Sequence, residues 1–324
     1  MPWLRPGWAE AWWEAWGAGD LELHVLRDGG RLAALLPLAR HRGALTGIAN
    51  WHTPSFGILA RDADAAAELA RAVVARRPRR VALAFLLPER RGLAEVRDAA
   101  AAAGYRLIVR TVERSPHVDT RTGWEAYERS LGRKLLSELR RRRRRLEERG
   151  ELRLEVLDGT DRLAELLEEG FGVEAAAWKG ARGTAIASDP PTRRFYERIA
   201  GWFAGRGALR LAFLRLDERA LAFDFAVEED GVHYLLKTGY EPEFRNFAPG
   251  MLLRHEMIRR AFEDGLASYE FLGADEPWKL EWASTFRDLK VLQAFSPRPT
   301  GSVDWLAWAA GRPAAKRVLT LARR

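Results

Sequence analysis

Asp224 and Lys237 are the residues whose types and spacing most directly suggest chemistry. The segments around them alternate apolar and polar residues on either side of Asp230-Gly231, a dipeptide that tolerates the positive φ angles of a tight turn. If this dipeptide is the turn, Asp224 lies opposite Lys237 and both point to one face of the hairpin. The pair then has two interpretations. It is either the floor of a polar groove, with the carboxylate as base or amine anchor, or a cross-strand salt bridge on a half-solvated sheet.

A long loop follows this hairpin and leads into a helix that the sequence predicts to begin at Pro249-Gly250. The unpaired N–H groups and the dipole of a helix N-terminus favour a bound phosphate. Pro249 suits the first turn because it gives up no needed donor, and Gly250 allows a ligand to approach the backbone. The alternative is an ordinary Pro-Gly helix start.

The order of three strands, a loop, a helix and a fourth strand resembles the core of the GNAT acyltransferases. Arg245-x-x-Ala248-x-Gly250 is similar to their pyrophosphate loop, although Ala248 stands where the family has glycine. Residues 234–240, 249–253 and 271–279, with Trp282, resemble the acetyltransferase-like family associated with cellulose and exopolysaccharide biosynthesis, the CelD/BcsL type. The resemblance covers residues 110–300.

The resemblance implies a fold, a reaction and a donor site. The fold is α/β (α+β), with tandem GNAT-like domains as in the Fem peptidyltransferases, each a mixed, mostly antiparallel sheet flanked by helices. The reaction is transfer of an acyl group from acetyl-CoA or another acyl-CoA to an amine, without a metal or a covalent intermediate. The implied cofactor-binding residues are Arg245 and the backbone of Ala248, Gly250, Met251 and Leu252.

Further candidates follow the predicted strand 268–272. In GNAT folds the strands before and after the phosphate-loop helix splay apart, which places Asp275 and Glu276 at the mouth of the splay. There they can hold a cationic amine or relay its proton, whereas the alternative is simple helix capping. The candidate catalytic residues are Asp224, Lys237 and Glu276, and the candidate substrate-binding residues are Trp178, Lys179, Tyr240, Asp275 and Lys279.

Trp178 and Lys179 belong to this set through the resemblance alone. A Trp-Lys-Gly segment at this place is typical of the CelD/BcsL type. The surrounding residues 177–186 are rich in glycine and, without the resemblance, read as a linker.

The N-terminal half contains a short match to the C-terminal half. Residues 26–36 repeat the pattern of residues 214–224, with a strand, an acidic turn, an arginine and an alanine-rich strand in the same order. This match suggests an internal duplication. Leu36 stands near where Asp224 stands in the second copy, so we expect the first copy to be degenerate and to shape or cover the site.

The predicted domain organisation has four parts. A hairpin from about 21 to 40 follows an amphipathic helix with four tryptophans at 6–18, and helices and strands alternate as far as strand 105–112. The parts are a degenerate N-terminal GNAT-like domain (1–118), a basic connecting helix (119–150), a C-terminal GNAT-like domain (151–300) and a basic amphipathic tail helix (301–324).

The predicted helix 124–149 carries six consecutive arginines, from Arg140 to Arg145. Its leucines recur at helical spacing, and Arg142 or Arg143 occupies the place where the next apolar residue is due. At least one guanidinium therefore points toward the protein body. It meets an internal carboxylate or an anionic ligand, or it snorkels into solvent from a solvated basic helix.

Composition limits the class of protein and the kinds of chemistry that the chain can perform. With 47% hydrophobic and 30% charged residues, the chain is typical of a soluble globular protein. It has no cysteine, and its six histidines are scattered, which argues against disulfides, thiolate nucleophiles and metal chemistry. The N-terminus lacks the pattern of a signal peptide, and no apolar run reaches the length of a transmembrane helix. We therefore expect a bacterial, cytoplasmic enzyme.

Two alternatives to the acyl-CoA enzyme remain open. A Fem-like transferase would use aminoacyl-tRNA as donor, for which the net charge of +8 is natural. A non-catalytic pseudo-acyltransferase would bind an anionic polymer. The acceptor is expected to be a small molecule, glycan or peptide with an amine, and the basic tail could contact an anionic surface peripherally.

Overall fold

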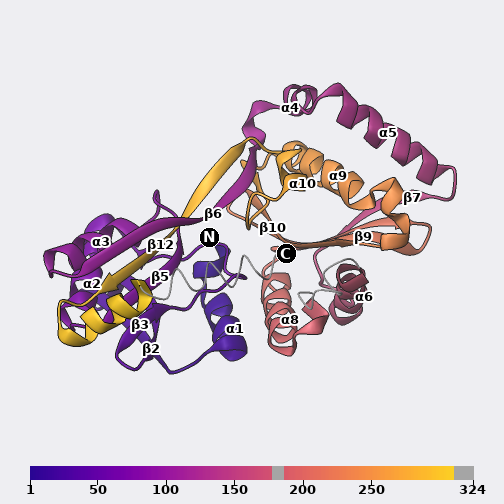
Figure 1. Cartoon of the computed structure of the whole chain (residues 1–324). Coiled ribbons are helices and arrows are strands. Elements are labelled where there is room, and N and C mark those ends of the chain that lie inside the picture. The colour runs from indigo at the N-terminus through magenta and orange to yellow at the C-terminus, as the bar shows by residue number, and fades with distance from the viewer. Residues whose placement is uncertain (177–185, 310–324) are drawn as a thin grey trace. The chain divides into compact units, whose positions relative to one another are not determined.

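The computed structural model describes residues 1–176 and 186–309 (Figure 1). Within them the chain forms two compact units. Unit 1 comprises Met1–Trp16 and Arg114–Arg287, and unit 2 comprises Gly17–Glu113 and, among the described residues, 288–309. Two long strands, β6 (Arg106–Asp119) and β12 (Thr285–Phe295), contribute residues to both units.

Unit 2 is a sheet flanked by helices. Its other elements are β1 (Asp20–Asp28), β2 (Arg31–His41), β3 (Ala44–Gly47), β4 (Leu59–Ala60), α2 (Ala63–Ala75), β5 (Arg80–Leu86) and α3 (Leu93–Ala102), and residues 299–309 are helical. The strand order is β1-β2-β3-β5-β12-β6, with β4 paired to β2. Asp62 begins α2 as its N-cap, accepting a hydrogen bond from the Ala65 N–H at 2.8 Å. The hairpin predicted around Asp28 is confirmed by β1 and β2.

Unit 1 holds the segments that carry the candidate residues. Its elements are α1 (Pro6–Trp16), α4 (Trp124–Ser130), α5 (Arg133–Glu147), β7 (Leu152–Leu157), α6 (Leu163–Ala176), α8 (Pro190–Ala204), β8 (Leu209–Leu216), β9 (Arg219–Glu229), β10 (Val232–Tyr240), the 3-10 helix η4 (Pro242–Phe247), α9 (Pro249–Glu263), β11 (Ser268–Glu270) and α10 (Pro277–Leu280). The order is β7-β8-β9-β10-β11-β6. All adjacent strands in this order are antiparallel except β10 and β11, which run parallel.

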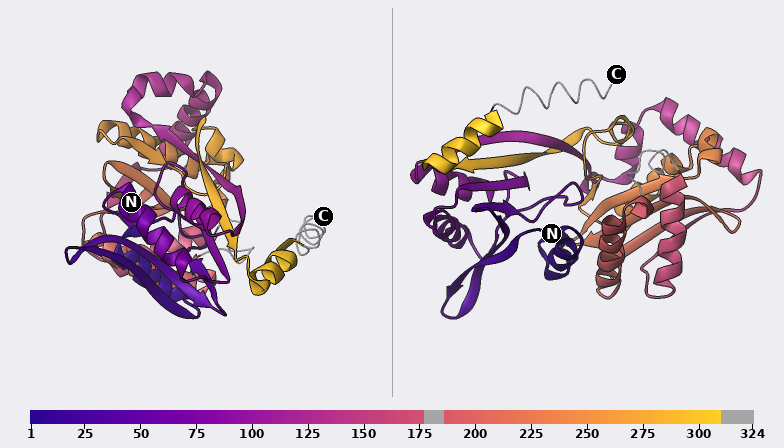
Figure 2. Two further views of the ribbon diagram at one scale, coloured as in Figure 1. Left: turned by 90° about the vertical axis from the view of Figure 1, so that its left-hand side faces the viewer. Right: turned by 60° about the horizontal axis from the view of Figure 1, so that its bottom comes forward.

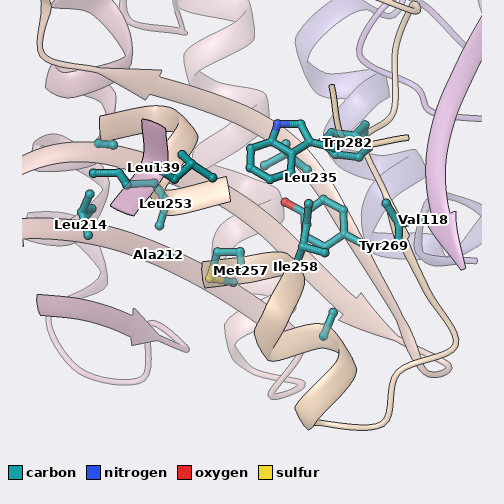
Figure 3. Close-up of a cluster of buried hydrophobic side chains, with 14 of the residues drawn as sticks. Val118, Leu139, Ala212, Leu214, Leu235, Leu253, Met257, Ile258, Tyr269 and Trp282 are labelled. Carbon is teal, nitrogen blue, oxygen red and sulfur yellow. The ribbon is translucent and has the colours of Figure 1, made fainter. Parts of the chain in front are cut away.

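Helix α9 forms the core of unit 1 on one face of this sheet. Leu253, Met257 and Ile258 are at most 1% exposed and lie among buried side chains of the strands (Figure 3). Helices α6 and α8 contact the strands as well, and the ring of Tyr196 on α8 packs against Phe225 of β9. Successive residues of a strand point to opposite faces, so β9 presents alternating side chains to the two helical layers.

Two details of the connecting region differ from the expectation. The predicted helix 124–149 is interrupted at Gly132, whose φ of +80° ends α4 before α5 begins. Glycine adopts this backbone conformation without the steric penalty of a Cβ atom. Residues 115–119, where the sequence predicts the boundary between the halves, lie within the continuous strand β6. The predicted fold class is confirmed: both units are mixed, mostly antiparallel sheets with flanking helices.

Candidate functional site

The parallel strands β10 and β11 separate after a short pairing. Only three residue pairs join them, from Val232 with Ser268 to Tyr234 with Glu270. Strand β11 then ends, whereas β10 continues for six further residues to Tyr240. Within the described part of the chain, β10 therefore has backbone groups on its β11 side that no strand pairs. This opening is the place where an extended ligand can bind along a strand edge.

The N-terminus of α9 follows directly from β10 through η4. Ala248 has φ of 48° and ψ of 54°, the left-handed conformation that glycine adopts most easily. Its N–H donates to the Arg245 carbonyl at 3.0 Å, and its carbonyl accepts from the N–H groups of Met251 and Leu252 at 3.0 and 3.2 Å. Of the predicted phosphate-binding amides, the Gly250 N–H is therefore the donor left without a partner among the described residues. The backbone geometry of the predicted loop is thus kept although glycine is replaced by alanine.

Exposed arginines surround this helix start. Arg245 lies in η4 with an exposed side chain, and Phe247, two residues on, is buried. The guanidinium groups of Arg145 and Arg149 stack on the Phe247 ring at 5.1 and 4.5 Å from its centroid. None of these three arginines has an acidic partner in the described part of the chain. Such planar, unpaired cations suit phosphate oxygens.

The inward-facing arginine expected on the basic helix is Arg143. It contacts the carboxylate of Glu256 on α9, and its Nε donates to Glu147 on its own helix at 3.0 Å. Of the alternatives weighed from the sequence, the internal carboxylate is therefore the one found. This contact fixes α5 against α9 and leaves Arg145 and Arg149 beside η4.

The predicted pairing of Asp224 with Lys237 is wrong. Asp224 lies opposite Thr238, because a β-bulge between Leu235 and Lys237 inserts one extra residue into β10. Lys237 lies opposite Phe225 instead, and its ammonium group sits 5.3 Å from the ring centroid of Tyr196 on α8. A one-residue shift moves a side chain to the other face of a sheet, so the carboxylate and the ammonium point to opposite faces.

The partner of Asp224 is Arg254 of α9. Its Nη1 and Nη2 donate to the two carboxylate oxygens at 2.7 and 2.8 Å, and both side chains are at most 1% exposed. Arg254 also donates to the Tyr269 hydroxyl and, at 3.2 Å, to Thr238 Oγ1. Burial by itself lowers the pKa of Arg254, but the charges and hydrogen bonds of Asp224 and Tyr269 together outweigh burial and the pKa is raised. The guanidinium group therefore stays charged, and its contacts fix α9 to three strands.

Arg254 and Tyr269 are the residues that the sequence reasoning missed. A signal existed, because Arg254 lies at helical spacing from Ile258 and Ala261, both on the buried face of α9. An arginine at such a position requires a buried acceptor. Asp224, with alanines at 222 and 226, is the carboxylate that this reasoning would have selected.

The predicted residues after β11 form a compact loop. The Lys279 side chain is buried, and its Nζ donates to the carbonyls of Leu272 and Ala274 at 2.7 and 2.9 Å. Its Nζ also lies 3.2 Å from the exposed carboxylate of Glu276, which accepts from Trp278 Nε1 at 3.1 Å. Lys279 therefore holds the loop that presents Glu276.

The remaining predicted residues are dispersed. Asp275 lies 3.4 Å from Arg114 Nη1, and both groups are partly exposed. Tyr240 ends β10 beside the helix start, since a Cβ atom on Gly250 would meet its ring at 3.5 Å. Trp178 and Lys179 lie outside the described residues. Asp224, Lys237 and Glu276 do not form one cluster: the first is buried under α9 and the second faces α8.

Two open cavities lie elsewhere in unit 1. One, of about 470 Å³, lies between residues 120–124 and the C-terminal end of α9, and another, of about 380 Å³, lies between α1 and α8. No helix in residues 1–176 and 186–309 is long and apolar enough to cross a bilayer. The same residues contain no group of three or more side chains suited to hold a metal ion.

The site geometry can now be set beside known proteins. Solved structures of similar fold include FemX, with a TM-score of 0.59, 11% identity and coverage of 89% of this chain and 90% of that one. The C-terminal domain of a putative lysylphosphatidylglycerol synthetase from Agrobacterium fabrum has a TM-score of 0.57 and 13% identity, with coverage of 93% of this chain and 91% of that one. L-PGS from Bacillus licheniformis has a TM-score of 0.55 and 15% identity, with coverage of 91% of this chain and 93% of that one. At these identities the likeness establishes the fold.

A sequence comparison identifies the domain that carries the site. No curated protein is significantly similar to the chain. Residues 133–280 match the family described as an acetyltransferase (GNAT) domain, and this range contains the β10–β11 opening, η4 and α9. The match covers slightly less than half of the chain, and it shows a similarity of these residues to the GNAT acetyltransferase domain.

Proposed function

We propose that this protein is an N-acyltransferase that uses acyl-CoA, with acetyl-CoA the first choice, and an amine acceptor. The observation that carries the proposal is the opening between β10 and β11, which leads to the N-terminus of α9. An extended acyl donor can lie along β10 beyond its pairing with β11 while its phosphates reach the helix start. Acyl-CoA supplies an acyl group activated as a thioester.

The donor phosphates would be held by the helix start and its arginines. The Gly250 N–H and the positive end of the α9 dipole attract an anion, and Arg245 is exposed beside them. Arg145 and Arg149, held flat against Phe247, extend this positive surface onto α5. Preorganised guanidinium groups lose less side-chain freedom on binding than mobile ones.

The acceptor amine would meet the exposed carboxylate of Glu276. Lys279 and Trp278 fix this side chain near the end of β11, where it can hold an amine or accept its proton through water. Asp224 is assigned to positioning α9, because it is buried and bidentate with Arg254. Lys237 cannot orient Asp224 from the other face, and we assign it to an anionic part of the acceptor. Backbone N–H groups of β10 beyond its pairing with β11 would stabilise the developing oxyanion.

Calorimetric titration with acetyl-CoA and CoA tests the donor. Removal of Arg245 by Arg245→Ala should weaken binding about 10–100-fold, since a charge-assisted hydrogen bond contributes about 1.5–3 kcal/mol. Arg162→Ala is the matched control, because Arg162 is 66% exposed and touches only Glu165, at 3.8 Å. Equal loss in both variants, or no binding by the unmodified protein, would remove the acyl-CoA proposal.

An aminoacyl-tRNA donor is the second candidate, and the observation favouring it is the length of the basic helix. Arg140 and Arg144 are exposed on α5 in addition to Arg145, and none has an acidic partner in the described part of the chain. Their spread along the helix exceeds the reach of one pyrophosphate. Fem-like transferases, which the sequence resembles, use such donors, and FemX shares the fold.

Nucleic-acid binding separates the two donors. For a tRNA donor, filter binding should give an affinity that falls steeply with salt, and Arg140→Ala with Arg144→Ala should flatten the slope by about two charges. Under the acyl-CoA proposal, acetyl-CoA binds and tRNA at physiological salt does not. Binding of any polyanion alike, without transfer, would indicate a non-catalytic polymer-binding protein. We extend the proposal to an acceptor from cell-envelope or exopolysaccharide metabolism, and the resemblance to the CelD/BcsL type supports this choice.

A further inference from the structure

The outermost strand of unit 2 has an exposed apolar face. Among the strands that the structure describes, β1 ends the sheet order and pairs only with β2 (Figure 2, indigo). Leu21, Leu23 and Val25 alternate along it and are 40, 60 and 42% exposed. The opposite face of β1 is covered, since α2 packs on β1 and β2 and His24 is only 6% exposed. One face and one edge of this nine-residue strand are therefore open.

This edge carries only part of the usual protection against pairing. Edge strands commonly carry proline or charged side chains, or they bulge away from a partner. Residues 20–28 contain neither proline nor lysine, and the register irregularity with β2 lies at Leu26 and Arg27, near the end of the strand. The charge on the covered face, Glu22, is neutralised within the chain, because it accepts from Arg40 at 3.0 Å and lies 3.0 Å from His24. An edge with alternating apolar side chains on its open face is suited to pairing with another strand.

We propose that β1 pairs antiparallel with β1 of a second copy of this chain, about a twofold axis at Leu23. In this register Leu23 meets its own copy, Leu21 meets Val25, and Glu22 meets His24. All the exposed apolar residues of β1 are then opposite one another on one face. On the other face an acid stands opposite a histidine. The sequence of the strand is thus self-complementary, as a twofold interface requires.

The neighbouring registers are less favourable. Pairs in an antiparallel dimer must share a face, so the axis moves in steps of one residue and the alternatives centre on Glu22 or His24. An axis at Glu22 places two carboxylates directly opposite, which is destabilising. An axis at His24 places Leu21 against Arg27 and two histidines together. Only the register centred on Leu23 satisfies both faces.

A disulfide tests the axis directly, because the chain has no cysteine of its own. Residues opposite each other in antiparallel strands have Cα atoms about 4.5–5.5 Å apart, within the range that a disulfide spans. Leu23→Cys should form a covalent dimer on mild oxidation, seen on a non-reducing gel. Leu32→Cys is the control, since Leu32 is 51% exposed on the same hairpin but distant from the axis. Equal cross-linking of both variants would overturn the proposal.

The mass in solution provides an independent test. Light scattering of the unmodified protein over a range of concentrations should show a dimer that dissociates on dilution. Leu23→Lys should be monomeric at concentrations at least tenfold higher, with an unchanged melting temperature at low concentration, because two lysines would meet at the axis. A monomer throughout, or a dimer that Leu23→Lys leaves intact, would overturn the proposal.

Discussion

The hairpins β1–β2 and β8–β9 share a sequence pattern and have opposite environments. When residues 26–36 are aligned with 214–224, the preceding residues Leu21, Leu23 and Val25 correspond to Leu209, Leu211 and Phe213. The first three are 40–60% exposed, whereas the second three are fully buried. The difference arises because β1 is an edge strand and β8 lies between β7 and β9.

The ends of the two hairpins differ in the same way. Leu36 is fully buried opposite His24, and Asp224 at the corresponding place is fully buried with Arg254. Of these two residues, Asp224 ties its strand to α9 through an ion pair. The hairpin with the buried carboxylate lies in the residues that match the GNAT domain, and the hairpin with the buried leucine lies in unit 2.

The largest expected effect comes from breaking the buried pair. Asp224→Ala should lower the free energy of unfolding by about 3–5 kcal/mol, because it leaves the Arg254 charge buried without its partner. Urea unfolding measures this. The double change Asp224→Leu with Arg254→Met, which imitates the apolar hairpin, should recover most of the loss. If Asp224→Asn kept full stability and lost turnover, Asp224 would act in the chemistry and the comparison would fail.

Truncation of the corresponding leucines should separate the two strands. Leu211→Ala is expected to cost about 2–5 kcal/mol, the range for a buried leucine. Leu23→Ala should change stability by no more than about 0.5 kcal/mol, as for an exposed site. Both are measured by urea unfolding at low protein concentration, so that association does not contribute. Similar losses in the two variants would show that β1 is covered within a single chain.

The next contrast concerns the arginines near the ends of these strands, Arg27 and Arg215. Arg215 is buried and donates to Glu155 at 2.6 Å and to both oxygens of Glu169 at 2.6 and 2.9 Å. Within residues 1–176 and 186–309, the side chain of Arg27 donates only to the Gly30 carbonyl, at 3.1 Å. Arg215→Ala should cost about 1.5–3 kcal/mol in unfolding free energy. Arg27→Ala should cost no more than about 0.5 kcal/mol. A larger loss of unfolding free energy in Arg27→Ala than in Arg215→Ala would contradict the conclusion that Arg215 is the stabilising arginine.

The smallest expected effect is a pH dependence specific to β1. A hydrogen bond from Arg40 lowers the pKa of Glu22, and burial lowers the pKa of His24. Folding therefore favours the proton-free form of both groups, so the folded state loses stability as the pH falls, first below about 6.5 and then below about 4.5. Each group contributes about 0–1 kcal/mol. Glu22→Gln with His24→Asn should flatten the dependence of β1 amide exchange on pH, and an unchanged profile would contradict this.

The sequence predicts much of the fold because turn residues and apolar periodicity mark where the strands and helices begin and end. The Asp230-Gly231 turn predicted the β9–β10 hairpin, and the turn at Asp28 predicted the β1–β2 hairpin. Pro249-Gly250 predicted the start of α9. The phosphate-binding role of the loop at Ala248 stays a prediction, and the structure shows that Ala248 adopts the left-handed conformation. The break at Gly132 was missed because the leucine spacing continues across it.

The sequence by itself therefore determined the elements, their order and the loop at α9. The tertiary structure alone decided which charges meet. A bulge of one residue at Leu235–Lys237 exchanged the faces of β10, and Arg254 reached Asp224 from thirty positions along the chain. Local periodicity reports the direction of a side chain within its own strand or helix, but register irregularities and helix packing are set by non-local contacts. For that reason the helical spacing of Arg254 could indicate that it needs a buried acceptor, whereas the register that turns Lys237 away from Asp224 was decided by the tertiary structure.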